Sequence, residues 1–191
     1  MIEKNFKIQI RVACLGDSIT ELSGYPHMVS KRLGNNYVVG NFGACGTSVL
    51  LDSESPYIYS EALSQAKNFH PDIAIIMLGT NDAICSFEQN ELAFIDDYLM
   101  LVVNVQSFDS KPVVWIVKPP PIFGDGMWLN STVLSYKVIP AIMKVATRAN
   151  LQVIDVYSAL DNVCFFNDGV HPNCEAAKVI AEIVCQAIVS R

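Results

Sequence analysis

Several signatures of common catalytic and binding sites are missing from this sequence. It contains no G-x-S-x-G nucleophile elbow, no P-loop and no G-x-G-x-x-G turn, so the usual signals of an α/β-hydrolase serine and of a nucleotide site are absent. Its six cysteines include no C-x-x-C pair, which argues against structural zinc and thioredoxin-like chemistry. Scattered thiols are typical of a reducing compartment, so we expect a cytoplasmic protein.

Charge and long apolar runs are also scarce. Charged residues make up 17% of the 191, with 13 basic against 19 acidic side chains and a net charge of −6. No Lys/Arg cluster is present, which argues against a nucleic-acid partner. No run approaches the roughly 20 apolar residues of a membrane span. The N-terminal apolar run is broken by Lys7 and Arg11, which is too much charge for a signal peptide.

What the chain has instead is apolar residues, 51% of the total, gathered in short β-branched runs. The runs are nearly continuous rather than alternating, as in parallel strands that are covered on both faces. They fall at residues 8–15, 37–42, 73–78, 113–117 and 151–156.

Helical patterns separate these runs. They fall at residues 25–33, 61–69, 91–108, 131–149 and 173–189. Asn173 is a candidate N-cap, and Pro140 is expected to kink or restart the fourth helix. The alternation predicts one domain over residues 1–191, an α/β three-layer sandwich with a mostly parallel sheet and right-handed crossovers.

The uncommon polar and glycine-rich segments all follow strands. They are Gly16-Asp17-Ser18 after the first strand, residues 41–46 after the second, residues 79–82 after the third, and residues 167–172 beyond the fifth. In open α/β sheets, ligands bind beyond the carboxyl ends of the strands. The sequence therefore places a candidate site at this edge of the sheet.

Only one of the three histidines belongs to this edge. His70 precedes the third strand and His27 lies on the first helix, so neither is expected to be catalytic. His171 comes three residues after Asp168, and a short turn brings that carboxylate onto the imidazole and leaves Nε2 free to take a proton from Ser18. Each motif alone fits a plainer role, with Ser18 as a helix cap and Asp168 as a turn residue. Together they favour a Ser18, Asp168 and His171 triad.

Acyl transfer also needs donors for the oxyanion of its tetrahedral intermediate. The Ser18 amide lies near a helix start, Gly43 has no side chain to shield its N–H, and Asn81 ends a buried strand. Gly43 and Gly46 equally fit a simple turn, and Asn81 fits a tie between loops. Candidate substrate contacts are Asp17, Tyr57, Phe123, Met127 and Trp128.

These residues resemble the four blocks of the SGNH (GDSL-type) hydrolases. The matching stretches are GDSIT around Ser18, NFGACG with Gly43, GTND with Asn81, and DGVHP with Asp168 and His171. The chain is similar to the small bacterial branch described as sialate O-acetylesterase-like or lysophospholipase-like. One departure is Ala176, where many members carry glycine.

The resemblance implies a flavodoxin-like fold with strand order 2-1-3-4-5. It implies that Ser18 is the nucleophile, that His171 is general base and then acid, and that Asp168 orients the imidazole. The oxyanion hole would comprise the Ser18 amide, the Gly43 amide and the Asn81 side chain. The expected reaction is hydrolysis of a small-molecule carboxylic ester, without metal or organic cofactor.

Short acyl groups on a carbohydrate or similar alcohol are the preferred substrates, and a lysophospholipase or thioesterase acting on longer chains is the alternative. Three other functional hypotheses stay open. They are a phosphate-binding module without catalysis, a carbohydrate-binding protein that has lost activity, and a metal hydrolase using Asp17, Asp168 and His171.

Overall fold

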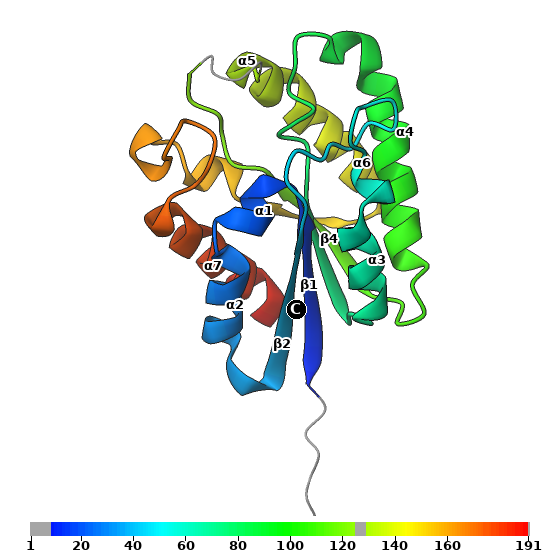
Figure 1. Ribbon diagram of the computed structural model, residues 1–191, viewed down its shortest axis with the longest axis vertical. Coiled ribbons are helices and arrows are strands. Elements are labelled where there is room, and N and C mark those ends of the chain that lie inside the picture. Colours follow the sequence, from blue (N-terminus) through cyan, green and yellow to red (C-terminus); the bar gives the residue numbers. More distant parts are fainter. Residues whose placement is uncertain (1–8, 125–128, 191) are drawn as a thin grey trace, which may run out of the picture.

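Five parallel strands form one sheet, and their order is β2-β1-β3-β4-β5, which confirms the expected order. The computed structural model describes residues 9–124 and 129–190 (Figure 1). The strands are β1 (Ile10–Gly16), β2 (Tyr37–Gly43), β3 (Ile73–Met77), β4 (Val113–Lys118) and β5 (Gln152–Asp155). Each lies within two residues of its predicted bounds, and position 8 of the first prediction falls outside the described residues.

Helices cover both faces of the sheet, which is why the strands read as continuous apolar runs (Figure 1). In β1, Ala13 and Leu15 belong to a core shared with α3, α4 and α6, whereas Val12 and Cys14 belong to a core shared with α2 and α7. The helices are α1 (Ser18–Leu22), α2 (Tyr25–Leu33), α3 (Glu61–Asn68), α4 (Phe87–Gln106), α5 (Ser131–Val133), α6 (Ile139–Ala149) and α7 (Cys174–Val189).

Two of the helix predictions need adjustment. The structure begins α4 at Phe87, four residues earlier than the pattern at 91–108 indicates. The single helix predicted at 131–149 is three pieces, namely α5, the π-helical turn Leu134–Val138, and α6. Pro140 stands in the first turn of α6, so the helix restarts where a missing N–H costs nothing.

The start of α7 follows its prediction closely. Asn173 is its N-cap, with Oδ1 accepting the amide N–H groups of Glu175 and Ala176. Ala176 is fully buried in the core between α2, α7 and the sheet, where its methyl group contributes to packing. This cap fixes where the chain leaves the 167–172 segment and enters the helix.

Strand pairing brings the expected segments to one edge. Gly16, the last residue of β1, is opposite Gly43 of β2 on one side and Met77 of β3 on the other. The residues that follow these three strands therefore leave the sheet side by side. No helix in the described part of the chain is long and apolar enough to cross a membrane.

Candidate active site

Ser18 lies at the start of α1, directly after the end of β1. Asp17 is the N-cap of this helix, and its Oδ1 accepts the Ile19 amide N–H at 2.9 Å. A Cβ on Gly16 would overlap the Thr20 hydroxyl and the Met77 carbonyl, so only glycine allows the strand to turn this tightly. The Ser18 side chain is thereby presented at the carboxyl end of the sheet, on the first turn of a helix.

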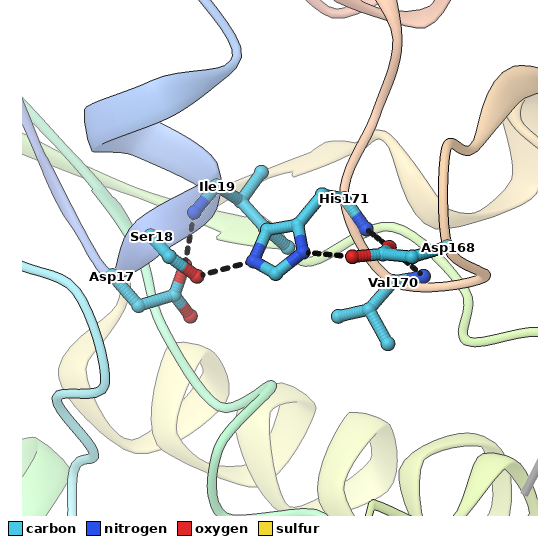
Figure 2. A network of polar contacts seen from close by, with 6 residues as sticks. All are labelled: Asp17, Ser18, Ile19, Asp168, Val170 and His171. Carbon is cyan, nitrogen blue, oxygen red and sulfur yellow. Dashed lines mark hydrogen bonds and ion pairs between the residues drawn. The ribbon is translucent and has the colours of Figure 1, made fainter. Parts of the chain in front are cut away.

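A chain of hydrogen bonds joins Ser18 to His171 and Asp168 (Figure 2). The Ser18 Oγ is 3.0 Å from His171 Nε2, and His171 Nδ1 is 2.7 Å from Asp168 Oδ2. The other Asp168 oxygen accepts the amide N–H groups of Val170 and His171, at 3.0 and 2.7 Å. The predicted residues therefore meet, although 153 positions separate Ser18 from His171 in the sequence.

The Asp168 carboxylate is held in its charged form. Partial burial raises its pKa, but the hydrogen bonds from His171 and Val170 outweigh that effect and lower the pKa to about 2. A charged acceptor on Nδ1 favours the tautomer that carries its proton there. Nε2 is then left with a lone pair directed at the Ser18 hydroxyl.

Two backbone hydrogen bonds hold the turn between Asp168 and His171. The Asn167 N–H donates to the His171 carbonyl at 3.0 Å, and the Phe123 N–H donates to the Gly169 carbonyl at 2.7 Å. Gly169 has φ +84, and a Cβ there would overlap the Phe123 carbonyl. Glycine is required at this position both for its backbone angle and for the close approach of the second chain segment.

Asn81 ties the segment after β3 to the loop after β2, and the expectation for the Gly43 amide needs correction. The Gly43 amide N–H donates to Asn41 Oδ1 at 3.0 Å, and a Cβ on Gly43 would overlap the backbone of Glu21. This glycine therefore lets β2 pack against α1, and its N–H is already used. Asn81 Nδ2 donates one hydrogen to the Thr47 carbonyl at 2.8 Å and keeps a second hydrogen.

The amide N–H of Gly46, unlike that of Gly43, is available to a ligand. Gly46 is exposed, has φ +73, and precedes Thr47, whose carbonyl binds Asn81. Across residues 9–124 and 129–190, no acceptor takes the amide N–H of Ser18 or of Gly46. The sequence signal that distinguishes Gly46 is its place immediately before the polar pair Thr47 and Ser48, but the sequence alone does not show which amide is free.

Two carboxylates hold the backbone that follows Gly46. Asp82 accepts the amide N–H groups of Val49 and Leu50 at 3.0 to 3.1 Å, and Asp97 accepts that of Leu51 at 2.9 Å. Burial raises the pKa of Asp82 to about 6, although these N–H bonds partly lower it. The segment from 49 to 51 is thus fixed to the end of β3 and to α4.

Two pockets adjoin these residues. The serine pocket, of about 240 Å³, is lined by Ser18, Ile19, Leu22, Ser23, Asn167, Asp168, His171 and Pro172. The amide pocket, of about 580 Å³, is lined by Gly46, Ser48, Asp52, Ser53, Glu54, Ser55, Asn81 and Ile84.

Some of the predicted substrate contacts are not open to a ligand, and others lie outside the described residues. Asp17 is 1% exposed and Tyr57 is fully buried, with its hydroxyl donating to the Phe42 carbonyl, so neither reaches a ligand and both predictions are wrong. Phe123 packs against Phe166, with ring centroids 5.2 Å apart, and supports the 167–172 segment. The other two candidates, Met127 and Trp128, lie outside the described residues.

The remaining two histidines lie at the positions predicted from the sequence. His70 follows α3 with φ +51, before β3 begins, and His27 is exposed on α2. Within residues 9–124 and 129–190, no group of three or more His, Cys, Asp and Glu side chains could hold a metal ion. The chemistry that the described arrangement supports is proton transfer between a hydroxyl and an imidazole.

Comparison with known proteins identifies a family that this chain matches. Residues 14–179 match the sequence profile of the GDSL-like Lipase/Acylhydrolase family. An acetylxylan esterase of Xylanibacter ruminicola is 31% identical over 206 aligned positions, covering 94% of this chain and 43% of that protein. The chain therefore spans less than half the length of this relative.

Solved structures share the fold. A carbohydrate acetylesterase of Sinorhizobium meliloti, Est24, superposes with a TM-score of 0.78 at 20% identity, covering 95% of this chain and 99% of that one. An aryl esterase of M. smegmatis gives a TM-score of 0.76 at 19% identity, with the same coverage. A lipase/acylhydrolase of Enterococcus faecalis gives 0.75 at 20% identity, covering 96% of this chain and 97% of that one.

The packing of Gly43 against α1 leads to a stability prediction. Gly43→Ala should lower the free energy of unfolding by about 1–3 kcal/mol, because its methyl group would displace the backbone of Glu21. Gly40→Ala, in the same strand, is the control, since its methyl group would meet only the movable outer edge of the Phe42 ring. Urea denaturation of both variants measures the difference, and equal losses would contradict this role of Gly43.

Proposed function

The chain belongs to the GDSL-like lipase/acylhydrolase family, and we propose that it is a serine esterase in which Ser18, His171 and Asp168 form the catalytic triad. One observation carries this proposal, the continuous chain of hydrogen bonds from Ser18 through His171 to Asp168. In such a chain the base lies within reach of the nucleophile and a charged carboxylate orients the base.

The reaction follows from the positions of the protons. Ser18 Oγ attacks the ester carbonyl while its proton moves to His171 Nε2, and Asp168 stabilises the resulting imidazolium across the 2.7 Å contact. The tetrahedral intermediate collapses as Nε2 gives that proton to the departing alcohol. His171 then takes a proton from water, which attacks the acyl-serine, and in the second collapse Nε2 returns that proton to Ser18 Oγ as the acid is released.

Three donors are proposed to hold the oxyanion. The Ser18 amide lies in the first turn of α1, where N–H groups have no partner within the helix. The Gly46 amide and the second hydrogen of Asn81 Nδ2 complete the set, and Asn81 is already oriented by its bond to the Thr47 carbonyl. Preorganised donors of this kind stabilise charge that appears only in the transition state.

The preferred substrate is a short acyl ester, acetyl above all, of a carbohydrate or similar alcohol. The serine pocket, at about 240 Å³, is small for a long fatty chain. The amide pocket is lined by hydroxyl and carboxylate groups, which accept and donate hydrogen bonds as sugar hydroxyls require. The acetylxylan esterase relative supports the same choice.

The charge of the amide pocket favours a neutral alcohol over an anionic one. Asp52 and Glu54 are exposed at its wall, and among the described residues lining the two pockets none is lysine or arginine. A carboxylated sugar or a phospholipid headgroup would be repelled there. All six cysteines are free, which supports the proposal of a reducing, cytoplasmic location.

Removing the nucleophile tests the triad. Ser18→Ala should lower kcat/KM for p-nitrophenyl acetate at least about a thousandfold, because the covalent step is lost while binding remains. Ser64→Ala, which changes an exposed serine on α3 that lines neither pocket, should keep activity within a few-fold. A fluorophosphonate should label the wild type at Ser18 and leave the Ser18→Ala variant unmodified; full activity of that variant would refute the mechanism.

A series of p-nitrophenyl esters tests the acyl preference. Acetate should be cleaved with a higher kcat/KM than butyrate, and butyrate with a higher value than octanoate, because the pocket beside Ser18 is small. Faster turnover of octanoate would favour the lysophospholipase or thioesterase alternative.

The charge preference is tested on the alcohol side. The wild type should hydrolyse an acetylated xylo-oligosaccharide faster than an O-acetylated sialic acid. The double variant Asp52→Asn/Glu54→Gln should raise kcat/KM for the anionic ester by about fivefold, as expected from about 1 kcal/mol between charges in water. The gain should shrink in high salt, and p-nitrophenyl acetate serves as the neutral control. An unchanged rate on the anionic ester would remove the electrostatic argument.

A further inference from the structure

Asp17 is a buried acid that precedes the candidate nucleophile in the sequence. Only one of its two carboxyl oxygens has a hydrogen-bond partner among the described residues. Its Oδ1 caps α1 by accepting the Ile19 amide N–H. Its Oδ2 is shielded from solvent and has no hydrogen-bond partner among the described residues. The Thr80 hydroxyl is also buried; it has no hydrogen-bond partner at ordinary distance among the described residues, but it lies close enough to Asp17 to lower the pKa of that carboxyl. An unsatisfied buried charge is costly, which makes a charged Asp17 an unfavourable state.

A second buried carboxyl, that of Asp82, competes with Asp17 for negative charge. Asp82 accepts amide N–H groups from Val49 and Leu50 with both of its oxygens, whereas Asp17 accepts a single N–H. Like charges in the same low-dielectric region disfavour each other. Because N–H donors stabilise the ionised form, the charge of this pair belongs on Asp82 and the proton on Asp17.

We propose that Asp17 is a positioning residue that acts as a neutral acid, capping the helix that presents Ser18 while keeping negative charge away from the oxyanion. This inference rests on the proposed esterase function. It assigns to Asp17 neither substrate contact nor proton transfer. Its role is to hold the Ser18 amide in place without adding a charge beside it.

The two charges that form during the reaction decide which state of Asp17 is useful. An ionised Asp17 would favour the imidazolium of His171 but oppose the oxyanion held at the next residue. The imidazolium already has the Asp168 carboxylate 2.7 Å from its Nδ1. The oxyanion has only neutral donors, so it would lose more from a nearby carboxylate than the imidazolium would gain.

The surroundings of Asp17 support a proton on it near neutral pH. Burial raises its pKa, the Ile19 N–H lowers it, Asp82 raises it, and Thr80 and His171 lower it, with a net pKa of about 7. Asp17 in turn affects titratable groups on neighbouring elements, which are Tyr25 on α2, Cys45 after β2, Tyr57 before α3, and Tyr98 on α4. Burial raises the pKa of each of these groups well above neutral, so Asp82 is the neighbouring carboxylate that matters around pH 7.

The test is Asp17→Asn, which keeps an oxygen to cap Ile19 and cannot ionise. We expect the ratio of kcat/KM for the variant over the wild type, on p-nitrophenyl acetate, to be constant below pH 6. Above pH 7 the ratio should rise, by at least about fivefold between pH 6 and pH 8.5, because only the wild type acquires a charge. A merely structural cap would give a ratio that does not change with pH, and that result would overturn the proposal.

Thr80→Val supplies a second variant that keeps Asp17 itself. The Thr80 hydroxyl lowers the pKa of Asp17, so its removal should move the alkaline fall in wild-type activity to higher pH. This shift remains measurable even where Asp17→Asn folds poorly. An unchanged profile would count against the proposal.

Thermal unfolding separates this inference from the esterase proposal. The pKa of Asp17 is raised on folding from 3.8 to about 7, so the stability that its proton contributes is fully present below pH 3.8 and is lost progressively until pH reaches about 7. The Tm of Asp17→Asn minus that of the wild type should therefore grow as pH rises to about 7 and stay constant above it. If the wild type hydrolyses no ester but this difference grows, the esterase proposal fails and Asp17 still holds a proton. If ester hydrolysis depends on Ser18 but the Tm difference and the activity ratio are both flat with pH, the inference about Asp17 is refuted.

Discussion

The pairing of β1 between β2 and β3 is the constraint on which the candidate site depends. Gly16 stands opposite Gly43 on one side and Met77 on the other, so the chain segments after these three strands leave the sheet together. Two close approaches make this possible, that of Gly16 to Thr20 and the Met77 carbonyl, and that of Gly43 to the Glu21 backbone. Ser18, Gly46 and Asn81 owe their common location to these glycines rather than to any direct contact among themselves.

The sequence predicts those parts of the site that depend on local spacing or on sheet topology. Asp168 and His171 are three residues apart, so one turn is enough to join them, and Asn173 caps the helix that follows. The layers follow from the alternation of apolar runs and helices, and the strand order is what the family resemblance implies. Ser18 and the Asp168–His171 pair meet because both follow strands of one parallel sheet.

What sequence reasoning misses depends on the direction of single groups. The sequence does not show which of the Gly43 and Gly46 amides is free, because this depends on the Asn41 side chain, which accepts the Gly43 N–H. Tyr57 and Asp17 lie in segments next to the site, but both point into the core, where the Phe42 carbonyl and the Ile19 amide bind them. Such outcomes are set by packing between distant segments, which no local pattern records.

The loop after Gly46 separates two kinds of acidic residue. The carboxylates that accept backbone N–H groups, Asp82 and Asp97, come from other segments and act only as far as Leu51. The carboxylates that face the amide pocket, Asp52 and Glu54, begin immediately after that point and are exposed. The N–H groups of residues 49–51 are therefore held by carboxylates that do not line the pocket. Substitutions at Asp52 and Glu54 would change the charge that faces the amide pocket and leave the N–H groups of residues 49–51 held as before.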